Sequence, residues 1–192
     1  LARRARFTSA IRFGSFRTPS IRPSRCAAAR TDRRYLALAH GTIDPADPRL
    51  RGLPGVAFEP GGTLRITTRL GRHPTDRQRQ AVSLKQGRRA VTRATMLESF
   101  GTPPTAMLVE CRLETGRTHQ IRVHMAALRH PCVGDPTYGA DPTLARKLGL
   151  ERQWLHAMGL GFIHPGTGDY VHFESTYPQD LQTALDRLAD MS

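Results

Sequence analysis

Apolar and polar residues alternate along several short stretches of this chain, which is the pattern of strands that bury one face. The clearest case is residues 108–114, where Val109, Cys111 and Leu113 alternate with charged residues. Similar patterns predict strands at residues 33–41, 64–70, 154–160 and 170–173, and a further strand beginning near residue 88. The chain therefore reads as a sheet-forming protein whose strands are separated by turns rich in glycine and proline.

Helical spacing follows the strand at residues 108–114. Ile121, Met125 and Leu128 recur at intervals that bury one stripe of a helix, which should begin after Gly116 and end before Pro131. Thr118 is placed to cap its N-terminus. The other predicted features are a loop over residues 44–55, a turn at 101–104, a short helix over 142–149 interpreted as more lid than core, and a final helix from Pro178.

The composition fits one soluble globular domain with a sizeable core. Hydrophobic residues make up 39% of the 192 residues and charged residues 23%, and no long uncharged apolar run predicts a membrane span. Cys26, Cys111 and Cys132 are widely spaced and form no paired metal-ligand pattern. A reducing compartment is the simpler interpretation, with Cys111 as a core thiol.

The net charge of +13 indicates a polyanionic partner, and its distribution matters more than its sum. Residues 1–34 hold ten arginines and one acid, which gives +9 and leaves +4 for the remainder. Within the remainder, residues 49–93 carry 11 basic residues against only Glu59 and Asp76. This local excess favours a nucleic acid partner, although a solvated basic face remains an alternative.

Polar residues gather where the strand at residues 108–114 turns into the helix. They lie at a strand end and on the first helical turn, where unpaired backbone N–H groups favour anions. The sequence therefore predicts a phosphate-facing corner at this junction. His119 and His124 are five residues apart and so do not share a helical face as two metal ligands would, and His124 is open to interpretation as a satisfied core histidine.

The same residues carry a family resemblance. GRTHQIRVH at residues 116–124, HP at 130–131 and GDPTYG at 134–139 resemble the motifs of RluA-type pseudouridine synthases. The resemblance covers about residues 31–190. It implies an α+β fold, with a mixed, largely antiparallel β-sheet and flanking helices, that is incomplete at the N-terminus.

The resemblance implies an enzyme that isomerises uridine to pseudouridine in structured RNA, either ribosomal or transfer RNA. Such an enzyme extrudes the base, and a buried carboxylate kept ionised by an arginine acts as nucleophile or base. By resemblance Arg122 is that arginine, and Tyr35 stacks on the extruded base and assists proton removal. From the residues alone, Arg122 is also open to interpretation as a surface arginine, and Tyr35 as a core tyrosine at a strand end.

The implied partner is RNA, and the chemistry needs no metal or organic cofactor. We expect Arg72, Arg77, Arg117, His119 and Gln120 to contact the RNA or to support the site. We also expect a cytoplasmic monomer with no membrane association and no obligate protein partner.

Residues 1–34 do not resemble the rest of the chain, because they are rich in Arg and Ser and nearly free of acids. Three interpretations remain open: a basic RNA-gripping arm, a transit-peptide-like segment, or a truncated or frame-disturbed beginning. The third is favoured by the missing initiator Met. It is also favoured by residues 2–10, which retain only part of the family's aspartate motif, HRLD followed by TSG, with Ala5 at the position of the aspartate. We expect residues 1–30 to be poorly ordered and residues 31–192 to form the catalytic domain portion.

Without that aspartate, the chain as written should be inactive, and Arg122 should lack its ion partner and swing towards solvent or phosphate. Asp135 is rejected as a substitute, because Gly-Asp-Pro predicts a turn in which the carboxylate caps its own backbone. An RNA-binding remnant without catalysis therefore stands beside the isomerase as an alternative. Reading the coding DNA around residues 1–34 in all frames for an encoded HRLD would distinguish the two.

Overall fold

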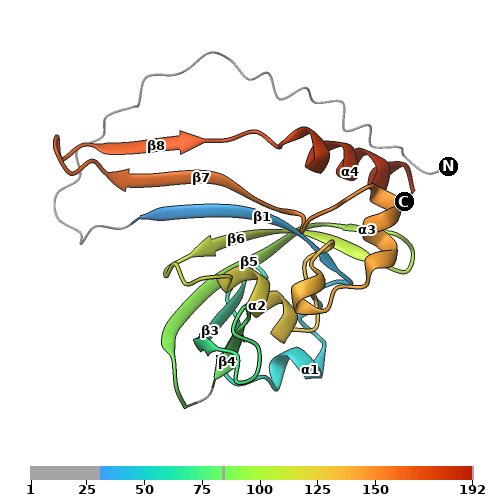
Figure 1. Cartoon of the computed structure of the whole chain (residues 1–192), viewed down its shortest axis with the longest axis horizontal. Helices are drawn as coiled ribbons and strands as arrows, with labels where there is room; N and C mark the ends of the chain where they lie inside the picture. Colours follow the sequence, from blue (N-terminus) through green and yellow to red (C-terminus); the bar gives the residue numbers. More distant parts are fainter. Residues whose placement is uncertain (1–30, 84, 192) are drawn as a thin grey trace.

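The computed structural model describes residues 31–191 except residue 84, so the expectations for residues 1–30 lie outside the described residues. Within this part, eight strands form one sheet with the order β2-β3-β5-β6-β1-β7-β8, and β4 pairs with β3 off this path (Figure 1). The strands are β1 (Asp32–His40), β2 (Val56–Phe58), β3 (Leu64–Arg72), β4 (Gln80–Ser83), β5 (Arg88–Phe100), β6 (Ala106–Leu113), β7 (Leu155–Ile163) and β8 (Tyr170–Glu174).

Every pairing between these strands is antiparallel. The predicted α+β class with a largely antiparallel sheet is therefore confirmed. The helices are α1 (Pro48–Arg51), α2 (Gln120–Ala127), α3 (Pro142–Leu148) and α4 (Gln179–Asp190), with a 3-10 turn η1 (Pro136–Tyr138). No helix in the described part of the chain is long and apolar enough to cross a membrane.

The central strand β1 buries both of its faces. Ala37 and Ala39 belong to the cluster under α2, whereas Leu36 and Leu38 belong to the cluster under α3 and α4. Successive side chains of a strand point to opposite faces, so the two helical layers cover opposite sides of the sheet. The small alanines lie on the face that α2 covers.

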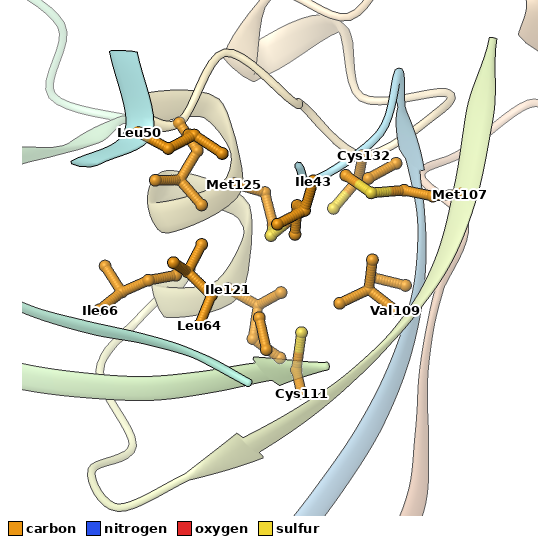
Figure 2. Close-up of a cluster of buried hydrophobic side chains, with 14 residues drawn as sticks. Ile43, Leu50, Leu64, Ile66, Met107, Val109, Cys111, Ile121, Met125 and Cys132 are labelled. Carbon is orange, nitrogen blue, oxygen red and sulfur yellow. The ribbon is translucent and has the colours of Figure 1, made fainter. Parts of the chain in front are cut away.

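Helix α2 packs through the stripe predicted from its sequence. Ile121, Met125 and Leu128 are buried in one cluster with the β3 residues Leu64 and Ile66, and Figure 2 shows Met125 beside Ile43 within it. The helix ends at Ala127, before Pro131, as predicted. This packing fixes the height and rotation of α2 over the sheet, and therefore the position of its first turn.

The opposite layer corrects the interpretation of α3 as more lid than core. Ala145 and Leu148 are buried in the same cluster as Leu181 of α4 and the fully buried Trp154. The indole Nε1–H of Trp154 donates to the carbonyl oxygen of Leu181 at 2.9 Å. Since its apolar face is covered by α4 and by Trp154, α3 is part of the core.

A short helix occupies the predicted loop at residues 44–55. Pro48 stands in the first turn of α1, and the side chain of Asp47 accepts a hydrogen bond from the Arg49 backbone N–H at 2.8 Å. Proline is favourable at the start of a helix because it lacks the N–H that would be unpaired there. Aspartate is favourable just before it because its side chain accepts a hydrogen bond from one of the unpaired N–H groups. Leu50 is then buried in the cluster under α2.

Candidate active site

The junction between β6 and α2 is held together by the side chain of Gln120. Its Oε1 accepts hydrogen bonds from Thr115 Oγ1 at 2.8 Å and from the Arg117 backbone N–H at 3.0 Å. Its Nε2 donates to the Val91 carbonyl oxygen and to Thr92 Oγ1, both at 3.0 Å. All four hydrogen-bonding positions of the amide are therefore used within the protein.

One expectation for this junction is wrong, because Thr118 does not cap α2. The N-cap position is His119, which has a φ of 56° and makes no side-chain capping bond. Gln120 is only 2% exposed and its amide is fully bonded within the protein, so it holds the junction together, while its contact with RNA stays a prediction.

Arg122 lies on the first turn of α2 and carries a buried ion pair. Its Nε donates to Asp135 Oδ2 at 2.6 Å and its Nη2 donates to Asp135 Oδ1 at 2.7 Å. The Arg122 side chain is 12% exposed and that of Asp135 is 0% exposed. The hydrogen-bonded carboxylate raises the pKa of Arg122, so the guanidinium is charged at any physiological pH.

This pair corrects the expectation that Arg122 lacks an ion partner. Asp135 does cap its own turn, as predicted, since its Oδ1 accepts from the Tyr138 backbone N–H at 3.3 Å. The same carboxylate also forms the bidentate pair with Arg122. Both oxygens are thus engaged and shielded from solvent, which leaves neither exposed to a substrate in this conformation.

Tyr138 connects the ion pair to the rest of the site. Its hydroxyl accepts a hydrogen bond from the Gln80 backbone N–H at 3.0 Å and lies 3.0 Å from His119 Nδ1. The guanidinium carbons of Arg122 and Arg79 lie 4.9 and 5.4 Å from the centre of its ring, within the range of cation–π attraction. Tyr138 therefore joins β4, η1 and the start of α2.

The contacts of Tyr138 also indicate the protonation of His119. The Gln80 N–H can only donate, so the phenol proton is free to point at His119 Nδ1. Burial and the nearby Arg122 charge lower the pKa of His119, which favours the neutral imidazole with its proton on Nε2. His119 is partly exposed and remains available at the surface of the site.

Tyr35 lies on β1, opposite Cys111 of β6 and Ala157 of β7. It is partly buried and packs on the cluster that contains Ile121, the neighbour of Arg122 in α2. In the described residues no hydrogen bond or ring contact joins Tyr35 to Arg122. Tyr35 and α2, which carries Arg122, therefore lie on the same face of the sheet.

His124 is a satisfied core histidine. Its Nε2 lies 2.9 Å from Thr68 Oγ1 and its Nδ1 lies 2.8 Å from Thr92 Oγ1, and the residue is fully buried. Burial lowers its pKa from 6.5 to about 4. It takes no part in metal binding, and no group of three metal-binding side chains occurs in the described parts of the chain.

We expect His124 to make the fold sensitive to acid. Between pH 6.5 and 4 the unfolded histidine binds a proton that the folded one does not, so the free energy of unfolding should fall by about 3 kcal/mol as the pH drops through this window. Urea unfolding at each pH measures this loss. His124→Gln retains polar groups for both threonines but cannot bind the proton, so its decrease in unfolding free energy over this pH window should be smaller by about 3 kcal/mol. Parallel pH profiles for the two proteins would contradict the prediction.

A basic groove of about 460 Å³ lies beside the junction. Arg72, Arg88 and Arg117 line it, together with backbone at Gly71, Gly87 and Gly116. The side chains of all 16 Asp and Glu residues belong to the described part of the chain, and none of them forms an ion pair with these three arginines. By contrast, Arg65 and Arg93 of the same acid-poor region pair with Glu59 and Glu114.

The groove brings together two arginines that were predicted to contact RNA and one, Arg88, that the sequence analysis did not single out. Arg72 and Arg117 line the groove, and Arg77 is exposed in the loop between β3 and β4. Arg88 joins them because β5 begins there, opposite Leu70 of β3. Its only signal in the sequence was membership of the acid-poor stretch at residues 49–93.

Comparison with known proteins places the chain in a family. The family model of RNA pseudouridylate synthases matches residues 25–127. An uncharacterised RNA pseudouridine synthase of Mycobacterium bovis is 48% identical over 154 residues, which cover 80% of this chain and 44% of that protein. The ribosomal large subunit pseudouridine synthase D of Zymomonas mobilis is 43% identical over 156 residues, covering 79% of this chain and 43% of that protein.

A solved structure shares the fold. Human RNA pseudouridylate synthase domain containing 1 aligns over 84% of this chain and 65% of its own, with a TM-score of 0.58 and 27% identity. The chain therefore belongs to the RluA-type RNA pseudouridine synthase family, whose members are isomerases. It spans less than half the length of the curated relatives described above.

Proposed function

We propose that this chain is the RNA-holding and base-stacking portion of a pseudouridine synthase that isomerises uridine in structured ribosomal or transfer RNA. The observation that carries the proposal is Arg122, a nearly buried guanidinium in a bidentate carboxylate pair, within GRTHQIRVH and beside a groove of unpaired arginines. In this reaction the bond from ribose to a uracil nitrogen breaks, a bond to a uracil carbon forms, and that carbon loses its proton.

Tyr35 and Arg122 take different roles in this proposal. Tyr35, which is partly buried at the leading end of β1, supplies the aromatic plane on which an extruded uracil stacks, and its hydroxyl supplies a polar group for proton removal. Arg122 is placed to keep a carboxylate ionised. The RNA backbone is held by Arg72, Arg77, Arg88 and Arg117. His119 supports Arg122 through Tyr138, which contacts both residues.

The reacting carboxylate is the part that this chain lacks. Asp135 pairs with Arg122 but is 0% exposed and has both oxygens bonded, so it cannot reach a ribose or a base without breaking that pair. We therefore propose that the chain as written binds RNA without turnover. This also supports the second candidate function, an RNA-binding remnant of the family.

We further propose a cytoplasmic monomer with RNA as its partner. Cys111 and Cys132 are free and buried, which suits a reducing compartment. A map of pseudouridines in ribosomal and transfer RNA, made from cells with and without this gene, tests the function and identifies the target. Identical maps would favour the RNA-binding remnant.

Binding should be electrostatic, because the groove arginines have no carboxylate partners. We expect the affinity for a labelled RNA stem-loop to fall steeply with salt, through counterion release. Replacing Arg72 or Arg77 by Ala should weaken binding at all sequences and lower the slope of log affinity against log salt by about 0.7 each, without unfolding the protein. Fluorescence anisotropy at several salt concentrations measures both quantities. Affinity that does not respond to salt would remove this part of the proposal.

A further inference from the structure

A second basic hollow lies on the face of the sheet opposite the groove. It has a volume of about 320 Å³ and is lined by Arg69, Arg89, Thr67, Thr68, Ser83 and the backbone at Pro54 and Gly55. Arg69 and Arg89 are paired residues of β3 and β5. In the next pair along the strands, Leu70 faces Arg88 of the groove. Because side chains alternate along a strand, Arg88 and Arg89 point to opposite faces of the same end of the sheet.

The hollow is electrostatically unsatisfied. Neither Arg69 nor Arg89 forms an ion pair with an Asp or Glu side chain, all of which lie in the described residues. The two guanidinium groups lie on neighbouring strands, so they repel each other and favour an anion between them. Thr67 adds a hydroxyl on this same face, at a position where it can donate to the same anion.

The local backbone is shaped to leave this space open. Gly55 has a φ of 78°, and its carbonyl oxygen accepts the Thr67 N–H at 2.7 Å. Any side chain at residue 55 would collide with the Thr67 carbonyl, so only glycine lets the loop at Pro54 form one wall of the hollow. The Arg69 side chain is also restrained, since its Nη1 donates to the Gly87 carbonyl oxygen at 3.3 Å.

The two basic sites are joined through backbone contacts. Arg117 of the groove donates from its Nε to the carbonyl oxygen of Arg89 at 3.1 Å. Groove and hollow thus flank one end of the β3–β5 pair, with arginines on both sides and no acid paired to any of them. A polyanion that leaves the groove past this end meets the hollow next.

We propose that the hollow is a second phosphate-binding subsite, which takes the sugar-phosphate backbone of the same RNA as it wraps around the end of β3 and β5. The inference rests on the proposed RNA binding and adds a contact on the face away from Tyr35 and Arg122. The ligand is recognised as a phosphodiester by two guanidinium groups and a hydroxyl, and no base is read.

The test compares the double variant Arg69→Ala/Arg89→Ala with Arg146→Ala/Lys147→Ala, which removes the same charge from exposed positions on α3. Anisotropy with a labelled RNA stem-loop should show a salt slope lowered by about 1.4 for the hollow variant, since each single-strand phosphate contact contributes about 0.7. Its affinity deficit should therefore shrink about sevenfold between 50 and 200 mM salt. The α3 variant should keep the slope of the unmodified chain.

Thr67→Val tests whether the hollow binds phosphate through a specific hydroxyl contact or through its positive charge alone. It removes the hydroxyl and keeps the branched shape, so affinity should fall about fivefold while the salt slope stays unchanged. An unchanged slope in Arg69→Ala/Arg89→Ala, or equal losses in the α3 control, would overturn the inference. A titration with inorganic phosphate completes the test. If the hollow binds phosphate but Arg69→Ala/Arg89→Ala leaves the RNA affinity unchanged, the hollow is a small-anion site and the inference is wrong.

The proposed function and this inference fail in different ways. If Arg72, Arg88 and Arg117 are replaced together and RNA affinity does not change, RNA binding at the groove is wrong. If that variant loses binding and the hollow variant does not, only the second subsite is wrong. Circular dichroism and thermal unfolding on each variant establish that the fold is retained.

Discussion

The chain as written should release tritium from RNA labelled at carbon 5 of uracil at a rate at least about four orders of magnitude below that of a complete family member. In the proposed function Tyr35 stacks a base and Arg122 holds a carboxylate, and neither of these roles forms or breaks the bond to uracil. Removing the reacting group of a catalytic unit leaves only the rate that binding and orientation provide.

Repair of the N-terminal segment is the matched control. A chain that carries the family's HRLD, with Asp at the place of Ala5 and an apolar strand behind it, should regain turnover in the same assay. Pseudouridine mass mapping of cellular RNA gives an independent readout. If the unrepaired chain matches the repaired one, another carboxylate does the work, and the proposed site is wrong.

Asp135→Asn should cost the fold about 3 kcal/mol or more, because it leaves the Arg122 guanidinium buried beside a neutral partner. Urea unfolding should show the loss as a lower midpoint with an unchanged slope. The matched control is Asp180→Asn, which breaks a bidentate pair with Arg152 whose side chains are both about two-fifths exposed. That change should cost under about 1 kcal/mol.

A double variant tests whether charge pairing, rather than volume, explains the loss. Arg122→Met/Asp135→Leu removes both charges and should recover most of the stability lost in Asp135→Asn, since two apolar groups need no ion partner. Equal stabilities of Asp135→Asn and the unmodified chain would mean that the pair does not hold η1 onto α2. RNA affinity measured on the same proteins reports whether a released Arg122 reaches phosphate.

The strands and the α2 stripe could be predicted because each follows from a local period of apolar residues. The elements that were missed lack such a period. All four residues of β4 are partly buried, and β2 has only three residues, so neither shows a clear alternation. The short α1 was hidden in a loop rich in proline and glycine, although Asp47 and Pro48 are a favourable helix start.

The candidate site was predictable in its members but not in its contacts. Arg122 and Asp135 both belong to quoted motifs, yet Asp135 was interpreted only as a local turn. Sequence spacing along α2 cannot show that the chain turns back after Pro131 and brings residue 135 against the first turn. The bonds of Gln120 were hidden for a similar reason, since its partners Val91 and Thr92 lie on a strand 28 to 29 residues away.

The position of β1 also sets the order in which the protein can be assembled on the ribosome. Strands β3, β4 and β5 pair with near neighbours in the sequence, and so do β5 with β6 and β7 with β8. In contrast, Ala37 of β1 pairs with Val109 of β6 and Leu155 of β7, so both partners are translated long after it. This apolar strand must wait unpaired while the intervening chain is made. The central element of the fold is thus among its last to be secured, and it is exposed to chaperones and to aggregation in the meantime.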